Sequence, residues 1–182
     1  ELPRLQSITR RRQRDRCFER RPDLRADLSV RVELLGRVSP RELANKGLDL
    51  AGKIKFPIGQ LECLEALSFA YAITSSFEKG FDAAYQSIDL SRKHAPAREV
   101  FGINMMGLLY QKLGDDKESL KWAQKAYYHP QLKQADYFTQ WSAMFLLAQE
   151  HERLNNLDSA GHFATETRAY SKLYFPFQES WA

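Results

Sequence analysis

The stretch Ile103–Ala126, INMMGLLYQKLGDDKESLKWAQKA, holds the pattern that decides the fold. Its first part repeats apolar residues three and four apart as far as Tyr110, and Gly114 then interrupts the pattern. Such spacing is typical of a helix with one buried side, and a glycine just after it is typical of a helix end. A second periodic run follows from Asp116. The stretch therefore predicts two helices joined by a very short turn.

The same pattern continues along most of the 182 residues, and no long stretch alternates apolar and polar residues as a strand would. Proline and glycine punctuate it at places that suit helix boundaries. The expected fold class is all-α, with eight helices in four pairs at about 24–36, 40–54, 57–75, 78–93, 97–113, 116–129, 134–154 and 157–173. Residues 4–20 are a candidate for one more helix, and residues 176–182 for the start of another.

Small residues recur at matching places in the four pairs. Two antiparallel helices joined by a tight turn approach to about 8–10 Å, so large side chains at the crossing would force them apart. The small-residue columns are Val32, Ser68, Gly107 and Ala148 in the first helices, where three of the four are small, and Ala44, Gly80, Ser119, Ala160 with Ala51, Ser87, Ala126, Thr167 in the second helices. The first column has intervals of 68−32 = 36, 107−68 = 39 and 148−107 = 41. Three columns in step over four units predict a helical repeat.

The repeat resembles the tetratricopeptide repeat (TPR) family, most clearly in the third unit. The residues that match the family pattern are Ile103, Met106, Gly107, Tyr110, Gly114, Ser119, Trp122 and Ala126, followed by Pro130. The other units depart from it, with Ser75 or Asn155 at the turn and His151 where tyrosine is usual. The resemblance implies a right-handed superhelical array, or α-solenoid, of about four antiparallel pairs over 24–173. Residues 1–23 would be a basic N-terminal segment or partial cap, and 174–182 the possible start of a C-terminal cap.

Intervals longer than the usual repeat resemble the TPR regions of bacterial signalling proteins, including sensor histidine kinases and peptide-sensing regulators. That resemblance implies a sensory or adaptor region that binds a protein or peptide. It would be cytoplasmic, or extracytoplasmic if it is the sensor region of a membrane kinase. The sequence begins with Glu1 rather than Met, which leaves two alternatives: a piece of a longer protein or a free adaptor.

Catalytic chemistry is not indicated by any motif. The sequence contains no phosphate-binding glycine loop, no G-x-S-x-G and no H-E-x-x-H. The four histidines are dispersed, and the acids at Asp115 and Asp116 suit the first turn of a helix. We therefore expect no enzyme, no catalytic residue, no cofactor and no metal site.

Charge and hydropathy leave two further hypotheses open. Residues 1–25 hold nine arginines against four acids, which is interpreted as a solvated end; binding of nucleic acid or an anionic surface is the alternative. Self-association is the other alternative, through exposed second helices and the apolar stretch Tyr174–Trp181. No apolar run approaches 18 residues, so we expect no membrane span within this chain.

A ligand groove is predicted on the first helices of the pairs, which line the inner side of such arrays. Its residues are offset from the small-residue columns: Glu65, Phe69, Phe101, Asn104, Leu108, Gln111, Lys112, Phe145, Gln149 and Arg153. Asparagine and glutamine amides suit a peptide backbone because they both donate and accept hydrogen bonds. The alternative is that these are ordinary solvent-facing or inter-repeat residues. Trp122 and Trp141 are interpreted as packing residues.

Overall fold

The structure, a computed structural model, describes residues 39–174. Within this range the chain forms helices and no strand. The α-helices are α3 (Pro40–Lys53), α4 (Pro57–Ile73), α5 (Phe77–His94), α6 (Glu99–Leu113), α7 (Asp116–Tyr127), α8 (Tyr137–Arg153) and α9 (Leu157–Tyr174), with short 3₁₀ helices η1 (Pro96–Arg98) and η2 (Leu132–Gln134). The all-α prediction is thus confirmed for this part of the chain. The helices expected at 4–20 and 24–36, with Val32, and at 176–182 lie outside the described residues.

The seven helices begin and end within three residues of the predicted bounds. The largest difference is at α8, which was expected from residue 134 and begins at Tyr137. Asp136 stands before it with an extended backbone, and its carboxylate accepts hydrogen bonds from the Thr139 backbone N–H at 3.0 Å and from the Thr139 hydroxyl at 2.6 Å. A side-chain cap of this kind satisfies a helical N–H that has no partner in the helix, and so sets the first turn.

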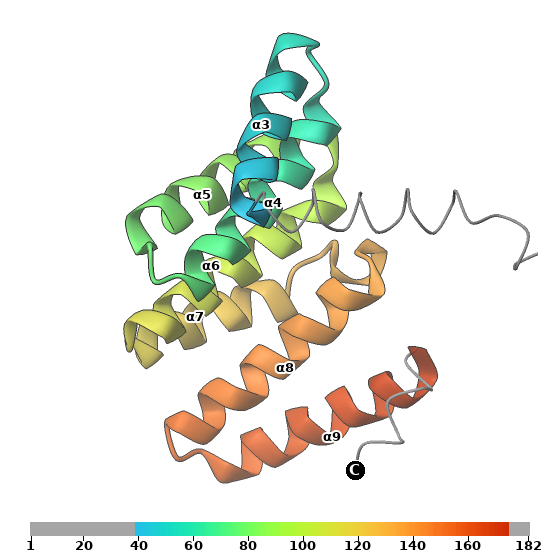
Figure 1. Cartoon of the computed structure of the whole chain (residues 1–182). Coiled ribbons are helices and arrows are strands. Elements are labelled where there is room, and N and C mark those ends of the chain that lie inside the picture. The colour runs from blue at the N-terminus through green and yellow to red at the C-terminus, as the bar shows by residue number, and fades with distance from the viewer. Residues whose placement is uncertain (1–38, 175–182) are drawn as a thin grey trace, which may run out of the picture. The chain divides into compact units, whose positions relative to one another are not determined.

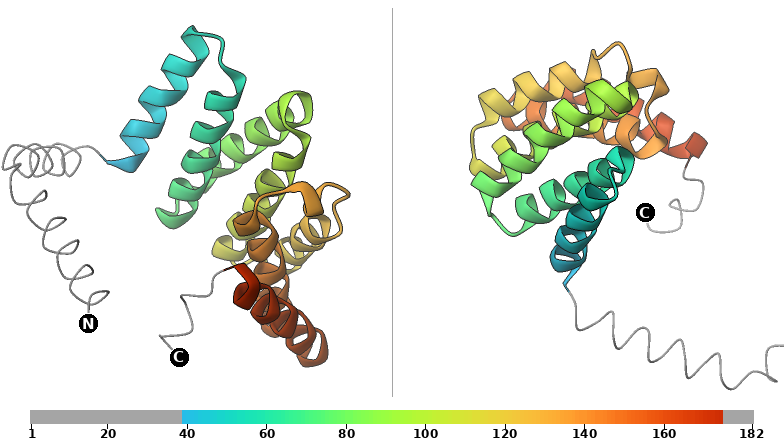
Figure 2. Two further views of the ribbon diagram at one scale, coloured as in Figure 1. Left: turned by 90° about the vertical axis from the view of Figure 1, so that its right-hand side faces the viewer. Right: turned by 90° about the horizontal axis from the view of Figure 1, so that it is seen from above.

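Each α-helix packs against the next one along the chain, so that successive helices lie side by side (Figure 1). A second set of contacts joins alternate helices, because α6 also packs against α4 and α8. The two further views show the same order (Figure 2). Helices α4, α6 and α8 therefore form a layer of their own, with α5, α7 and α9 as their hairpin partners.

In α6 and α7 the small-residue columns lie at the crossing of the two helices, as predicted. Ser68, Gly107, Ser119 and Ala126 are buried, and the Ser119 hydroxyl donates to the Gly107 carbonyl at 2.8 Å. A Cβ atom added to Gly107 would lie 2.7 Å from Leu146 Cδ2 and 3.4 Å from the Ala123 backbone nitrogen. Large apolar residues, among them Ile103, Met106 and Leu147, are fully buried between the crossings. The core therefore needs small residues where helices meet and large ones beside them.

Four of the six connections between the described α-helices share one backbone conformation. Lys55, Ser75, Gly114 and Asn155 all have positive φ, between 53° and 87°. In the three hairpin turns, the N–H after this residue bonds to a carbonyl five residues back: Ser76 to Tyr71, Asp115 to Tyr110 and Asn156 to His151, at 2.8–3.0 Å. This is the Schellman arrangement, in which glycine is favoured because a Cβ atom strains the left-handed backbone. Ser75, Gly114 and Asn155 are thus equivalent positions because they share one backbone conformation, although their side chains differ.

Ser75→Gly is expected to raise the free energy of unfolding by about 1 kcal/mol, since it removes the strain of a left-handed serine. Gly114→Ala should lower it by a similar amount. Chemical denaturation followed by circular dichroism measures both. A Ser75→Gly protein that is less stable than the parent would contradict the assignment of this turn.

Candidate binding surface

The predicted groove residues lie on the three helices of one layer. Glu65 and Phe69 are on α4, Phe101 to Lys112 on α6, and Phe145 to Arg153 on α8. They divide into two kinds by their surroundings. Phe69 and Phe145 are exposed aromatic rings, whereas most of the polar members bond to a neighbouring helix.

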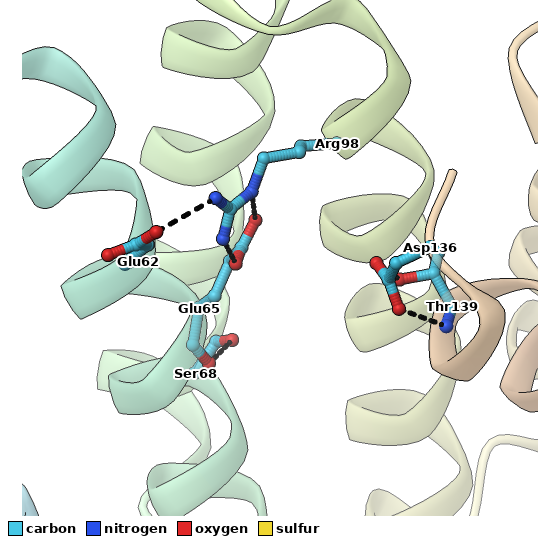
Figure 3. A network of polar contacts seen from close by, with 6 residues as sticks. All are labelled: Glu62, Glu65, Ser68, Arg98, Asp136 and Thr139. Atoms are coloured by element: carbon cyan, nitrogen blue, oxygen red, sulfur yellow. Dashed lines mark hydrogen bonds and ion pairs between the residues drawn. The ribbon is translucent and has the colours of Figure 1, made fainter. Parts of the chain in front are cut away.

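A carboxylate–guanidinium cluster joins α4 to the start of α6 (Figure 3). Arg98, the last residue of η1, donates from Nε to Glu65 Oε1 at 3.1 Å and from Nη2 to Glu65 Oε2 at 2.5 Å. Its Nη1 also donates to Glu62 Oε1 at 3.2 Å. Glu65 and Glu62 lie three residues apart on α4, so they present both carboxylates on one side of the helix. The fork of Arg98 therefore fixes η1 and the start of α6 against α4.

Glu65 is buried while Glu62 is exposed. Burial raises the pKa of the Glu65 carboxyl above its ordinary value, because the charged form loses water, and the hydrogen bonds and charge of Arg98 oppose this rise. The charges of Asp136 and Glu62 add to the rise. The Glu65 carboxylate thus depends on Arg98 for its stability as an ion.

Aromatic rings surround this cluster. Phe69 from α4, Phe101 from α6 and Phe138 from α8 line a cavity of about 290 Å³ together with Glu62, Glu65 and Arg98. Phe138 lies 6.0 Å from Trp141 between ring centroids, and Trp141 stacks on Phe145 at 5.0 Å. We call these five rings, Phe69, Phe101, Phe138, Trp141 and Phe145, the aromatic surface. Phe69, Phe138 and Phe145 are 44%, 50% and 40% exposed, so a large part of each ring is open to solvent.

The polar members of the predicted groove mainly join helices to one another. Asn104 donates to the Ser142 hydroxyl at 3.0 Å, and Gln111 donates to Gln149 Oε1 at 3.3 Å, both from α6 to α8. Arg153 donates to Asp116 of α7 at 2.7 Å. The bonds of Asn104, Gln111 and Gln149 use amide groups that were predicted to pair with a peptide backbone. Leu108 is partly buried and Lys112 is exposed.

A buried glutamate on α8 belongs to the same interface. Glu150 is completely buried; its Oε1 accepts from Gln111 Nε2 at 2.6 Å, and its Oε2 has no hydrogen-bond partner within the described residues. The residue 41 positions earlier, Leu109, is a fully buried leucine. Burial raises the pKa of the Glu150 carboxyl, and the hydrogen bond from Gln111 opposes the rise. A charged Glu150 is therefore a cost to the fold at neutral pH.

Glu150→Gln is expected to raise the free energy of unfolding by about 1 kcal/mol at pH 7.5, since the uncharged amide costs less to bury and can still accept from Gln111. The folded-state pKa of Glu150 is raised above the ordinary value of 4.5. The neutral carboxyl therefore favours folding at low pH, and this contribution to stability is lost as the pH rises above 4.5. The advantage of the variant should therefore shrink towards pH 4. Urea titrations at the two pH values measure this.

The matched control for Glu150→Gln is the exposed neighbour Glu152→Gln, which should change stability little at either pH. A gain for Glu150→Gln that is the same at both pH values would show that charge burial is not its cause.

Four members of this region were not among the predicted groove residues: Glu62, Arg98, Phe138 and Trp141. Phe138 lies in the first turn of α8, where the predicted helix start was three residues too early. Trp141, interpreted as a packing residue, is partly buried and stacks on Phe145. Arg98 lies 33 residues from Glu65, and no periodic pattern links two residues of that separation.

Over residues 39–174, no group of three or more His, Cys, Asp and Glu side chains is placed to hold a metal ion. None of the helices in this range is both long and apolar enough to cross a bilayer.

Comparison of the sequence with protein-family models and with curated proteins finds no match. The class that the described residues define is an all-α protein of successive, adjacently packed helices.

Proposed function

We propose that this protein is a binding scaffold of the TPR type, a right-handed α-solenoid whose α4–α6–α8 layer receives a protein or peptide. The proposal is supported by hairpin turns that recur at Ser75, Gly114 and Asn155, and by contacts between alternate helices. The resemblance to TPR regions of bacterial signalling proteins favours a sensory or adaptor role in signal transduction. The partner in that role would be an extended segment or a helix of another protein.

The observation that carries this proposal is the aromatic surface. Its five rings come from three helices. Phe69, Phe101 and Phe138 line one cavity, and the ring centroids of Phe138, Trp141 and Phe145 follow one another at 6.0 and 5.0 Å. Exposed aromatic rings that form a connected patch are the usual anchors of protein interfaces, where they bury much area with little loss of side-chain entropy. The layer beneath them is held by the bonds of Asn104, Gln111 and Arg98, so the rings sit on a rigid support.

The chemistry of the surface indicates the kind of segment that would bind. The cavity between Phe69, Phe101 and Phe138 has a mainly apolar lining and room for one aliphatic or aromatic side chain. Glu62 lies at its edge with an exposed carboxylate, 60% accessible at the side chain. We expect the bound segment to place an apolar side chain in the cavity and a basic residue near Glu62.

A random-peptide display library selected on the whole chain tests this proposal. The enriched peptides should lose affinity by about tenfold or more for Phe69→Ala and for Phe138→Ala, because truncating a central aromatic anchor costs about 2 kcal/mol. Fluorescence anisotropy of the labelled peptides gives the affinities. Enriched sequences should contain an apolar residue beside a lysine or arginine.

Tyr128→Ala is the matched control, since this exposed ring lies at the end of α7, outside the aromatic surface. It should leave peptide affinity unchanged. The proposal is wrong if the library yields no binder, or if Phe69→Ala and Tyr128→Ala affect the selected peptides equally.

A further inference from the structure

The cavity between Phe69, Phe101 and Phe138 is small and has acidic groups in its lining. Its volume of about 290 Å³ is below the roughly 300–1,000 Å³ of pockets that take whole drug-sized molecules, so it suits one compact chemical group. The three rings come from α4, α6 and α8, and two of them, Phe69 and Phe138, are exposed. A bound group would therefore meet aromatic surface from three helices.

Negative charge predominates around this cavity. Glu62 and Glu65 line it together with Arg98. Asp136, just before α8, is an exposed residue whose charge acts on Glu65 and helps to raise the pKa of that carboxyl (Figure 3). The four groups are three carboxylates and one guanidinium, which leaves a net charge of −2 when all are ionised. Such a field favours a positively charged ligand.

The carboxylates have little hydrogen-bonding capacity left for that ligand. Arg98 donates to both oxygens of Glu65 and to Oε1 of Glu62. Both oxygens of Asp136 accept from Thr139. A primary ammonium group has three N–H donors, and burying them in a mainly apolar cavity without acceptors costs free energy. A quaternary ammonium group has no N–H donor, so it avoids this cost.

Aromatic rings complement a quaternary ammonium group. The face of an aromatic ring carries negative partial charge and attracts a cation within about 6 Å of the ring centroid, more strongly where water is excluded. The methyl groups of the cation spread its positive charge over an apolar surface. They can therefore contact Phe69, Phe101 and Phe138 while the nearby carboxylates balance the charge.

We propose that this cavity binds a trimethylated ammonium group, the end of a trimethyllysine side chain on a partner protein, against Phe69, Phe101 and Phe138. Glu62 and Glu65 balance its charge. This inference rests on the proposed function and narrows what the cavity receives, because one group supplies both the apolar contact and the positive charge.

The test titrates the whole chain with two pairs of small probes at constant ionic strength, followed by NMR. Nα-acetyl-trimethyllysine amide is compared with Nα-acetyl-lysine amide, and choline with its uncharged isostere 3,3-dimethylbutan-1-ol. The methylated cation of each pair should bind about fivefold more tightly and shift the signals of Phe69, Phe101 and Phe138. Equal affinities within either pair would overturn the proposal. Choline that binds more tightly than the trimethyllysine amide would contradict the assignment to a side chain.

Two variants separate attraction by the rings and charges from simple apolar contact. Phe138→Leu keeps an apolar side chain but removes a ring, and Glu62→Gln removes an exposed charge. Each should lower the affinity for the trimethyllysine amide about threefold and leave that for 3,3-dimethylbutan-1-ol unchanged. Circular dichroism checks that both keep their helices.

The matched controls are Tyr128→Leu and Glu78→Gln, an exposed ring and an exposed acid that do not line the cavity. They should change neither affinity, and effects equal to those of Phe138→Leu and Glu62→Gln would overturn the proposal. The proposed function has a separate outcome. Library peptides that depend on Phe69 and Phe138 would support it even if the cavity does not distinguish trimethyllysine from lysine, a result that overturns only the present inference.

Discussion

Gly107→Leu is expected to lower the free energy of unfolding by about 3 kcal/mol, the upper part of the range for overpacked cores. A Cβ atom at Gly107 would already lie 2.7 Å from Leu146 Cδ2 and within 3.5 Å of backbone atoms of Ala123 and Ser119. Leu146 can rotate away, but the α7 backbone cannot move without separating the two helices. That separation would also break the 2.8 Å bond from Ser119 to the Gly107 carbonyl. Urea denaturation of the two proteins measures the difference.

Gly52→Leu is the control for this prediction, because Gly52 is an exposed helix glycine whose Cβ would meet only Gln60 Nε2, at 3.2 Å. Leucine is a better helix former than glycine by less than about 1 kcal/mol, so this variant should be slightly more stable than the parent. Gly107→Leu has the same gain in helix propensity. The difference in unfolding free energy between the two variants therefore measures the cost of the larger side chain at the α6–α7 crossing. If both variants are stabilised, helices α6 and α7 are not in close contact at Gly107.

The helices could be predicted because the signals that specify them are local. Apolar spacing, proline at helix starts and small residues at crossings all lie within one hairpin, and the predicted bounds hold to within three residues. Even where Ser75 and Asn155 replace the usual turn glycine, the columns on either side predict the turn, and both residues adopt the positive φ that glycine would have. Local consistency of this kind is what makes a repeat readable from one sequence.

The surroundings of the proposed groove residues could be predicted only in part, because they depend on contacts between hairpins. Phe69 and Phe145, which the offset from the columns assigns to the groove, have exposed side chains on α4 and α8. The offset cannot show that the amide N–H groups of Asn104 and Gln111 donate to side chains of α8. Those bonds depend on residues that lie 38 positions later in the sequence. Arg98 was missed for the same reason: its partner Glu65 lies two helices earlier.

Arg98→Met is expected to lower the free energy of unfolding by about 2 kcal/mol at pH 7. Removing one partner of a fully buried ion pair costs about 3–5 kcal/mol, and the figure is reduced because the Arg98 side chain is 33% exposed. The loss arises mainly from Glu65, which stays buried without its cation. Its folded-state pKa, already raised by burial, rises further when Arg98 is absent. A carboxyl with a raised pKa favours folding at low pH, so the loss should be smaller at pH 4 than at pH 7.

Two further variants separate the buried charge from the lost contacts. Adding Glu65→Gln to Arg98→Met removes the unpaired carboxylate and should recover part of the stability at pH 7 but little at pH 4. Arg153→Met breaks a more exposed pair with Asp116, 45% accessible on the arginine side, and should cost less than about 1 kcal/mol. Should Arg98→Met cost no more than Arg153→Met at pH 7, Glu65 would have another source of stabilisation, and Arg98 would not be what holds the start of α6 against α4. If Arg98→Met costs clearly more than Arg153→Met, the bidentate bond between Arg98 and Glu65 both supports the aromatic surface and sets the pH dependence of this part of the fold.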